Sequence, residues 1–303
     1  MAYLETAYHR SARKNPTVLF PAAKTIIVLG IPYRLTTRQE MQQRNAGVIC
    51  GYAIEKDYHE RIPQMLEPLA ALLQEISPTS THPRIFTDSA PILERELAAR
   101  AGLGWIGRNS CLINPDWGSA FLLAEIFTDV EIEPDIPFEQ DHCGNCDRCI
   151  KACPTSCILP DRIIDANRCI SYHSIENRAE IPTWIMDKFS NQVFGCDICQ
   201  TVCPWNRLNL IETVSDKQEN LIPLEEMDRL MNLSQQEFND LYGSTPVSRV
   251  KRVGFIRNIL IARHHLHSTG SNEWYKNLQE SEAIESDPVL RTTARWILSQ
   301  KNT

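Results

Sequence analysis

Hydrophobic residues follow two kinds of pattern along the first 140 positions. Short runs rich in β-branched and aromatic residues, "KTIIVLGIPY" (24–33), "RIFTD" (84–88) and "FLLAEIFTD" (121–129), predict buried strands. Between them, "HERIPQMLEPLAALLQEIS" (59–77) and "PILERELAARAG" (91–102) repeat apolar residues with the helical period. The first part of the chain is therefore expected to mix α and β structure.

The sequence also predicts the apolar face of the first helix and the two ends of the second. The first should place five apolar side chains on one face: Ile62, Leu66, Leu69, Leu73 and Ile76. The second should begin at Pro91, because proline suits the first helical position, and end at Gly102, because glycine suits the residue after a helix.

The rest of the chain changes character at a proline-rich, acidic connector (129–141) that leads into a cysteine-rich region. Further on, "VSRVKRVGFIRNILIARHHLHS" (247–268) and "DPVLRTTARWILSQ" (287–300) are two helical patterns that together look like one HEAT-type repeat. We therefore expect three domains: 1–135, 136–215 and 216–303.

Composition indicates an ordinary globular chain. Of its 303 residues 43% are hydrophobic, but no apolar run approaches the roughly 20 residues that a membrane helix needs. The first residues show no apolar core and no twin arginine, so we expect a cytoplasmic protein. In that reducing compartment cysteines rarely form structural disulfides, and nine of the eleven lie between 143 and 203, which indicates a local metal site.

The cysteine spacing favours iron–sulfur clusters over zinc. Cys143, Cys146, Cys149 and Cys153, followed by a proline, reproduce the run C-x2-C-x2-C-x3-C-P, in which three thiolates bind one cluster and the fourth binds a neighbouring cluster. Zinc sites tend instead to use two separated C-x2-C pairs.

A second, incomplete run of this kind follows. Cys196, Cys199 and Cys203 lack one upstream cysteine, which Cys169 can supply. The crossing pattern then gives each [4Fe–4S] cluster four cysteines: Cys143, Cys146, Cys149 and Cys203 for one, and Cys153, Cys169, Cys196 and Cys199 for the other. Cys157 is left over, and we interpret it as a small buried residue. Such clusters carry single electrons but do not select a substrate, so the upstream domain should hold a cofactor or a partner.

Two further motifs match known signatures only in part. "GLGWIG" (102–107) has the glycine spacing of a dinucleotide site, but it follows a predicted helix, whereas that site must follow a strand. We interpret it as a helix stop with a tight loop, or as a loop whose backbone lies against a flat cofactor. "DYHERI" (57–62) begins like the cobalamin motif D-x-H-x-x-G but has Ile62 in place of the glycine, so we interpret His59 as a helix-start or polar site residue.

Two single residues have ordinary structural explanations on the sequence alone. Asp88 follows a predicted strand and precedes a helix, where an N-cap formed by Asp88 or Ser89 is the default and a catalytic acid the less common role. Cys50, within "GVICGYA" (47–53), is typical of a small apolar residue.

A basic stretch lies in the tail. Positions 241–272 contain no acidic residue, which in a chain of net charge −7 suggests a surface for phosphates. Its lysine and arginines are Arg249, Lys251, Arg252, Arg257 and Arg263. The alternative is an ordinary solvated helix face.

Together these segments resemble the epoxyqueuosine reductases, cobalamin and iron–sulfur enzymes of queuosine-tRNA maturation. The resemblance is carried by "SARKNPTVLFPAAKTIIVLGIPY", "ICGYAIEKDYH", "FTDSAPILERELAARAGLGWIGRNSCLINPDWGS", "LLAEIFTDVEIEPD", "HCGNCDRCIKACPT", "RCISY" and "GCDICQTVCPWN". It implies an α+β fold with a nitroreductase-like domain that holds base-off cobalamin, a ferredoxin-like domain with two [4Fe–4S] clusters, and a short HEAT-like tail.

The resemblance also implies roles for single residues. Asp88 would donate a proton above the cobalt, and Cys50 would lie beside the corrin. The cofactor would further be lined by Arg13, the loop around Leu112, Leu123, Ser171 and Asp197. The basic residues of the tail would bind the anticodon stem-loop of tRNA.

The implied reaction is the reduction of epoxyqueuosine to queuosine and water at the wobble position of tRNA. An external one-electron donor, such as a flavodoxin or ferredoxin, would feed the clusters, and cobalamin would supply a two-electron centre. We expect a monomer that does not bind membranes. Two other classes stay open at this point: a cobalamin-dependent reductive dehalogenase and a ferredoxin-like electron carrier without a corrin.

Overall fold

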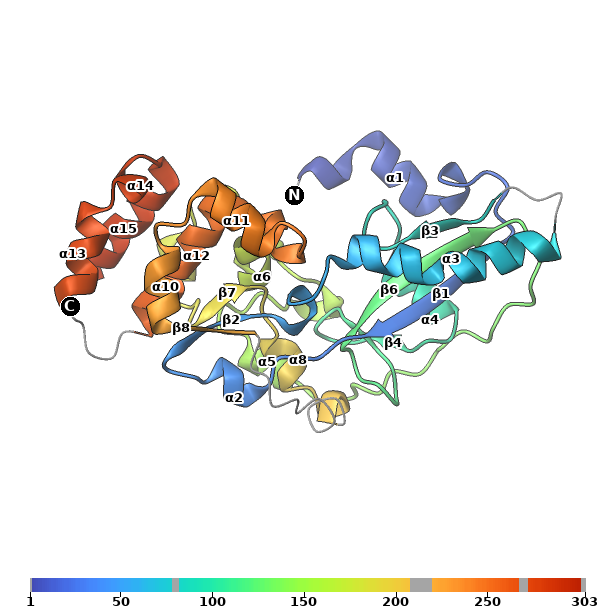
Figure 1. Ribbon diagram of the computed structural model, residues 1–303. Coiled ribbons are helices and arrows are strands. Elements are labelled where there is room, and N and C mark those ends of the chain that lie inside the picture. Colours follow the sequence, from blue (N-terminus) through green and yellow to red (C-terminus); the bar gives the residue numbers. More distant parts are fainter. Residues whose placement is uncertain (1, 78–81, 208–219, 267–271, 301–303) are drawn as a thin grey trace. The chain divides into compact units, whose positions relative to one another are not determined.

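The computed structural model describes residues 2–77, 82–207, 220–266 and 272–300 (Figure 1). The chain divides into two compact units. Unit 1 contains Met1–Tyr33 and Asp57–Cys146, and unit 2 contains Arg34–Lys56 and Asp147–Thr303. The three expected domains stay a prediction, and the boundary between 215 and 216 lies outside the described residues.

Unit 1 is built on a three-stranded antiparallel sheet in the order β1 (Thr25–Pro32), β6 (Phe121–Thr128), β3 (Arg84–Phe86). β6 pairs with β1 along its whole length, from Pro32 opposite Phe121 to Thr25 opposite Thr128. The three strands form where the apolar runs predict them, because each run is long enough to cross a buried sheet. β4 (Trp105–Ile106) and β5 (Leu112–Ile113) form a separate two-stranded hairpin.

Two helices of unit 1 cover this sheet. α3 (Tyr58–Ile76) contacts β3 and β6, and it buries Ile62, Leu66 and Leu73 as predicted. Ile76 was expected on the same face, but it is 63% exposed because it is the last residue of the helix. α4 (Glu94–Arg100) contacts β1 and β6 and begins three residues later than predicted, since 89–93 form an irregular loop. α1 (Ala7–Lys14) adds Ala12 to the core.

Unit 2 is built on a second sheet in the order β7 (Gln192–Phe194), β2 (Ala46–Ile49), β8 (Leu221–Pro223). β2 is parallel to β7 and antiparallel to β8. The predicted tail helix α12 (Lys251–His265) contacts β2 and β7, and its residues from Gly254 to Arg263 are all buried (Figure 1). A helix that is buried on all sides lies at the centre of a core rather than on its surface.

Short helices surround the core of unit 2. They are α2 (Arg38–Met41), α5 (Arg148–Ala152), α6 (Ile170–Ile175), α7 (Thr183–Met186), α8 (Ile198–Thr201), α10 (Leu224–Leu230), α11 (Gln235–Tyr242), α13 (Asn272–Glu280), α14 (Glu282–Glu285) and α15 (Pro288–Gln300). The second tail pattern forms α15, which packs on α12. Within the described ranges, no helix is both long and apolar enough to cross a membrane.

Candidate active site and cluster-binding region

Asp88 lies in the loop that joins β3 to α4 in unit 1. Its φ is 49°, in the left-handed region, which a residue other than glycine adopts only when its surroundings hold it there. Its backbone N–H donates a hydrogen bond of 2.7 Å to Glu94 Oε1 in the first turn of α4. The N-cap position of α4 is occupied by Leu93, so the expected N-cap role for Asp88 or Ser89 is wrong.

The Asp88 carboxylate is held on one side and open on the other. The Tyr58 hydroxyl donates a hydrogen bond of 3.0 Å to Asp88 Oδ2. Burial, followed by the Asp88 charge, raises the pKa of Tyr58 above its ordinary value, which keeps the hydroxyl a donor. His59, in the first turn of α3 as predicted, places Nε2 at 3.9 Å from the same oxygen. The Asp88 side chain is 68% exposed and can therefore reach a bound molecule.

Two further carboxyl groups of unit 1 interact with Asp88, and sequence analysis missed both. Glu125 lies on β6 opposite Phe86, is fully buried, and has no hydrogen-bond partner for either carboxyl oxygen within the described residues. Burial, with the charges of Glu94 and Asp88, raises the pKa of Glu125 to about 9. Burial also raises the pKa of Glu94 to about 7. At neutral pH Glu125 thus holds a proton and Glu94 is about half protonated.

In unit 2, Cys50 forms a closed polar group with Asp197. Cys50 is 0% and Asp197 2% exposed, and burial raises the pKa of each. Cys50 and Thr36 donate hydrogen bonds to the Asp197 carboxyl, the second through the Thr36 backbone N–H at 3.4 Å. The charge of Cys196, a predicted cluster ligand, also acts on Cys50. Gly195 has φ of 76°, and a Cβ there would lie 2.6 Å from Cys50 Sγ.

Two cysteines of unit 2, Cys153 and Cys169, are hydrogen-bonded to Cys157. Cys157 Sγ lies 3.4 Å from Cys153 Sγ, and the Cys157 thiol is also hydrogen-bonded to Cys169. These hydrogen bonds are the main reason why the pKa of Cys153 is lowered to about 5 and that of Cys169 to about 7. Cys157 is buried, as expected, but it is in contact with two predicted ligands rather than separate from them. The thiolate is the form that binds metal, so the environment suits Cys153 and Cys169 as ligands.

The remaining predicted ligands lie in loops or on short helices. Cys143 and Cys146 belong to unit 1, where the Trp105 indole N–H donates to Cys143 Sγ at 3.5 Å. Cys149 lies on α5 and Cys203 follows α8, and these two helices of unit 2 contact each other. The grouping of the cysteines into two clusters stays a prediction.

The other predicted corrin contacts are ordinary residues of the fold in this structure. Arg13 Nη1 donates to the Leu4 carbonyl at 2.7 Å, and Leu112 on β5 is buried. Leu123 on β6 accepts a hydrogen bond from Thr87 through its carbonyl, at 2.8 Å. Ser171 is half-buried on α6.

The glycine motif 102–107 follows α4 and contains the short strand β4 instead of opening a helix, so it is not a dinucleotide site. Gly102 has φ of 78° and ends α4, while the Leu103 N–H donates to the Ala98 carbonyl at 2.9 Å. A Cβ on Gly104 would lie 2.0 Å from the Ile113 carbonyl oxygen. The bare backbone is therefore required by the protein's own packing, which favours the helix stop over a cofactor-facing loop.

Two of the five predicted tRNA contacts lie in the interior of the tail. Arg257 is 0% exposed and donates to the carbonyls of His173, Asn177 and Ala179 at 2.7–2.9 Å. Arg263 is 6% exposed and pairs with Asp228 at 2.7 Å. Guanidinium groups held in this way stabilise the fold, and in this structure neither of the two is exposed to a phosphate.

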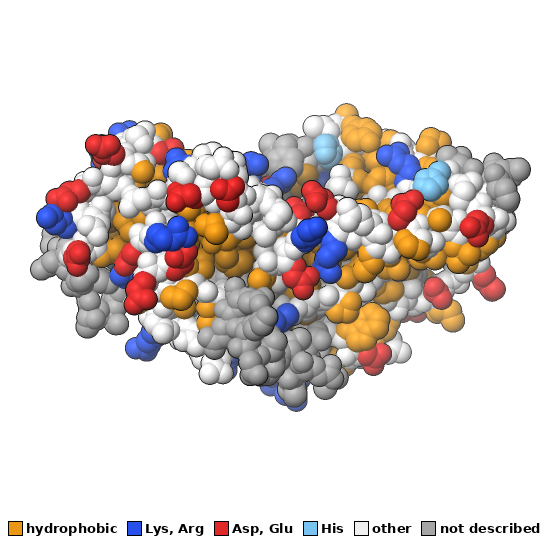
Figure 2. Space-filling view, in the orientation of Figure 1, with side chains coloured by type: hydrophobic (Ala, Val, Ile, Leu, Met, Phe, Trp, Pro, Cys, Tyr) orange, Lys and Arg blue, Asp and Glu red, His pale blue; other side chains and the backbone are white. Residues whose placement is uncertain are grey.

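The other three basic residues lie nearer the surface. Arg249 pairs with Glu176 at 2.9 Å, and Arg252 donates to the Leu233 carbonyl at 3.0 Å. Lys251 is exposed. On the face shown in Figure 2, acidic and basic side chains alternate over the helices of the tail.

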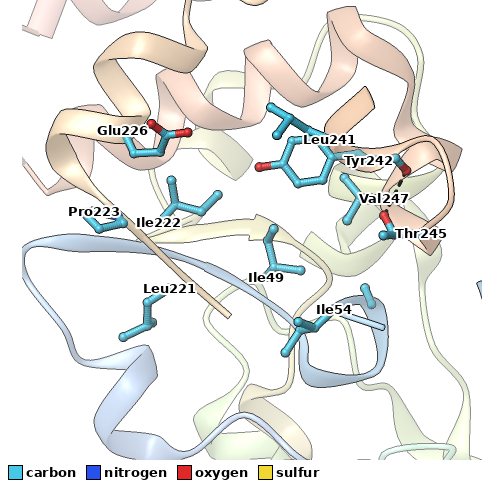
Figure 3. A pocket seen from close by; sticks show the side chains of 11 residues that line it. Ile49, Ile54, Leu221, Ile222, Pro223, Glu226, Leu241, Tyr242, Thr245 and Val247 are labelled. Carbon is cyan, nitrogen blue, oxygen red and sulfur yellow. Dashed lines mark hydrogen bonds between the residues drawn. The ribbon is translucent and has the colours of Figure 1, made fainter. Parts of the chain in front are cut away.

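Two cavities lie within unit 2. The first, of about 220 Å³, lies between β2, β8 and α11 and is lined mainly by apolar side chains such as Ile49, Ile222 and Val247, with Glu226 and Tyr242 at its edge (Figure 3). None of the predicted site residues lines it. The second, of about 560 Å³, is basic and lies beside Cys203.

Two family models match the chain. Residues 142–206 match the 4Fe-4S double cluster binding domain, and residues 13–89 match the model described as "Epoxyqueuosine reductase QueG, DUF1730". The chain therefore carries an iron–sulfur domain in the region where the cysteine spacing predicts it.

Whole-chain comparisons agree with these models. The epoxyqueuosine reductase of Cyclobacterium marinum is 41% identical over 86% of this chain and 82% of its own, and that of Escherichia coli K12 is 32% identical over 97% and 77%. A solved selenomethionine-labelled epoxyqueuosine reductase matches with a TM-score of 0.82 and 29% identity, covering 93% of this chain and 75% of that one. A structure of epoxyqueuosine reductase with an epoxyqueuosine-modified tRNA-Tyr stem-loop matches with a TM-score of 0.79 and 28% identity, over 93% and 74%. With this identity over most of both sequences, the chain belongs to the epoxyqueuosine reductase family.

Proposed function

We propose that this protein reduces epoxyqueuosine to queuosine in tRNA. The observation that carries the proposal is an exposed carboxylate, Asp88, held in a left-handed loop by Tyr58 and Glu94 in a chain of this family. A solved relative from Bacillus subtilis is described with an aspartate catalytic loop swung out of the active site, and a second is described with the modified tRNA stem-loop. Both descriptions support a loop aspartate that acts on a tRNA base.

The reaction sets a proton requirement that the carboxyl groups of unit 1 can meet. Removal of an epoxide oxygen as water consumes two electrons and two protons and leaves a C=C bond. Asp88 would donate a proton to the departing oxygen, as a general acid does. The buried Glu125 and the half-buried Glu94, whose pKa values burial raises to about 9 and about 7, would hold further protons near Asp88.

We propose that the eight cysteines bind two [4Fe–4S] clusters in the two sets given by their spacing, which agrees with the double-cluster domain at 142–206. Donors around the sulfurs support this assignment. The Cys157 backbone N–H donates to Cys153 Sγ at 3.4 Å, and backbone N–H groups of Ser171 and Tyr172 point at Cys169. Hydrogen bonds of this kind tune the potential of a cluster.

We propose base-off cobalamin as the second cofactor, with an α+β, nitroreductase-like first domain. Its contacts would be the residues given by the resemblance: Arg13, Cys50, Asp88, Leu112, Leu123, Ser171 and Asp197. One observation supports the fit. Asn109 is 5% exposed and its amide nitrogen has no partner among the described residues, in the loop that leads to Leu112, where an amide of the cofactor could accept from it. When bound, the cobalt would supply the two-electron chemistry that an iron–sulfur cluster cannot supply alone.

For tRNA we propose a reduced set of contacts. Lys251 is exposed, and Arg249 and Arg252 lie beside it near the start of α12, in the short HEAT-like tail. Cations placed in this way can neutralise phosphates of the anticodon stem-loop. We further propose that the protein acts as a monomer in the cytoplasm, where tRNA is modified.

The proposal can be tested in cells that lack their own epoxyqueuosine reductase. Expression of this chain should convert the accumulated epoxyqueuosine in tRNA to queuosine, measured by mass spectrometry of the nucleosides. The Asp88→Asn variant serves as the matched control. Unchanged epoxyqueuosine in cells that contain the intact, cluster-loaded wild type would refute the proposal.

A further inference from the structure

The second cavity of unit 2 is surrounded by cations that lie far apart in the sequence. It is a groove of about 560 Å³ formed by α2, α5, α8 and the residues that follow α8. Its lining includes four basic residues: Arg38, Arg148, Lys151 and Arg207. All four are exposed. Because α8 contacts both α2 and α5, packed secondary structure fixes this arrangement.

The positive charge of this basic groove is largely uncompensated. Lys151 pairs with Asp147 at 2.8 Å on the surface of α5. Within the part of the chain that the structure describes, Arg38, Arg148 and Arg207 have no acidic partner. Such a concentration is unexpected in a chain of net charge −7, and a local field of one sign attracts partners of the other sign.

The groove also contains a predicted cluster ligand. Cys203 is part of its lining, with Val202 and Pro204 beside it. The other predicted cluster has a different environment. The charge of its predicted ligand Cys196 acts on Cys50, which is buried together with Asp197. The cluster that Cys203 binds is therefore the one that a molecule seated in the groove would meet first.

We propose that the basic groove docks an acidic one-electron carrier protein, and that electrons enter the chain through the cluster held by Cys203. This inference rests on the proposed function, since it requires the clusters. In each encounter the reduced carrier loses one electron and the cluster gains it, passing from [4Fe–4S]2+ to [4Fe–4S]+ with no proton transferred. Two encounters supply the two electrons that one epoxide consumes.

An acidic protein fits the groove better than RNA does. A nucleic acid requires cations but has no reason to approach a cluster thiolate, whereas an electron carrier must bring its prosthetic group close to the cluster. An acidic carrier would be repelled by the net charge of −7 elsewhere, so a local positive surface is needed to orient it. Cations at the rim of a docking surface act mainly on the association rate and its salt dependence.

Replacing groove arginines with glutamate distinguishes the docking of the carrier from the reduction of the cluster itself. The test uses cluster-loaded protein without tRNA, and compares wild type with Arg148→Glu, Arg38→Glu and the double variant. Lys188→Glu, an exposed lysine of unit 2 outside the groove, makes the same change of charge as a control. Reduced flavodoxin, an acidic flavin protein, is the probe carrier, and dithionite is a small reductant that needs no docking surface. Bleaching of the visible cluster absorbance gives the rate.

The proposal predicts that the double variant is reduced by flavodoxin at least about ten-fold more slowly at low salt, within the 10–10³ range of electrostatic steering. Reduction by dithionite, cluster content and the Lys188→Glu control should not change, and 1 M salt should remove the difference because it shortens screening to about 3 Å. Equal flavodoxin rates in all variants would overturn the proposal. So would normal flavodoxin rates combined with weaker binding of a tRNA stem-loop, which would assign the groove to RNA. Failure of the proposed function would show separately, as clusters that reduce normally in a wild type that forms no queuosine.

Discussion

Each unit contains ionisable side chains whose pKa values are raised by burial, Glu94 and Glu125 in unit 1 and Cys50 and Asp197 in unit 2, but only those of unit 1 lie next to a carboxylate that reaches solvent. In unit 1 the carboxyl cluster of Asp88, Glu94 and Glu125 extends from a fully buried side chain, Glu125, to one that is 68% exposed, Asp88. In unit 2 Cys50 and Asp197 are 0% and 2% exposed, and neither has an open end.

The difference indicates different chemistry. In unit 1 two carboxyl groups that hold protons near neutral pH, Glu125 and Glu94, interact with the exposed Asp88, and such an arrangement can supply protons to a bound molecule. A closed, buried pair next to Cys196, a proposed cluster ligand, excludes water, which would affect the potential of that cluster rather than the movement of protons. The comparison therefore separates the delivery of protons from the delivery of electrons.

The largest effect is expected at Asp88, the exposed member of the carboxyl cluster. Asp88→Asn keeps the shape and the hydrogen bond to Tyr58 but removes the acid, so turnover should fall by about 10²–10⁴-fold, the usual contribution of a general acid. Cobalamin binding, followed by the visible spectrum, should be unchanged. Asp116→Asn, in an exposed loop of unit 1, is the matched control. Activity retained in Asp88→Asn would remove Asp88 from the mechanism.

The next effect concerns the sulfur ligands of unit 2. Cys169→Ser should lose one of two clusters, so that iron and acid-labile sulfide fall to about half, because a serine oxygen is a poor ligand for this type of cluster. Cys157→Ser, only a few ångströms from the same sulfurs, should keep both clusters. Iron analysis and EPR of the reduced proteins would check this. If Cys157→Ser loses a cluster and Cys169→Ser does not, the ligand assignment is wrong.

A smaller effect is expected from filling the space beside Cys50. Gly195→Ala introduces a Cβ at 2.6 Å from Cys50 Sγ and strains a φ of 76°, and it should lower the free energy of unfolding by about 2–4 kcal/mol. Gly144→Ala, with φ of 50° and no atom within 4 Å of the new Cβ, should cost about 1–2 kcal/mol from backbone strain alone. Denaturant unfolding measures both, and equal costs would show that Cys50 is not tightly enclosed.

The last effect differs in kind, because it is a dependence of stability on pH caused by Glu125. Its pKa rises from 4.5 in the unfolded chain to about 9 in the fold, so the folded state binds a proton that the unfolded state lacks between these values. Wild-type stability should therefore fall as pH rises through this window, by at most about 1.4 kcal/mol per pH unit, and level off above pH 9. Glu125→Gln should remove this slope and gain stability relative to wild type as pH rises.

The control for this measurement is Glu96→Gln, since Glu96 is half-exposed on α4 and pairs with Arg100 at 3.2 Å. Its unfolding curves should follow those of wild type at every pH. Parallel curves for wild type and Glu125→Gln between pH 5 and 9 would mean that Glu125 is ionised in the fold.

Much of this architecture follows from local patterns in the sequence. β1, β3 and β6 form where continuous apolar runs lie, because a short run of this kind is buried when it forms a strand inside a sheet. The cysteine spacing predicted the iron–sulfur domain, since ligand spacing reflects the geometry of the cluster itself. Gly102 ends α4 as predicted, although the start of the helix does not follow from Pro91 because the Asp88–Glu94 hydrogen bond reshapes the loop.

The features that sequence analysis missed depend on contacts between distant segments. Arg257 looks like any surface arginine until His173, Asn177 and Ala179 surround it with carbonyls. Glu125 is the one charged residue in the apolar strand β6, and this is the single sequence feature that could have identified it. The four basic residues of the groove come from three separate segments, whereas the basic run of the tail, which is conspicuous in the sequence, is partly interior.

The central claim is that this chain reduces epoxyqueuosine in tRNA, and a purified system tests it most directly. The protein, loaded anaerobically with cobalamin and both clusters and then reduced, would be incubated with an epoxyqueuosine-containing tRNA stem-loop, and the nucleosides analysed by mass spectrometry. The account predicts a nucleoside lighter by one oxygen, identical to queuosine, with wild type and none with Asp88→Asn. Unreacted epoxyqueuosine after incubation with fully loaded wild type, under conditions in which the Escherichia coli relative completes the reaction, would contradict it.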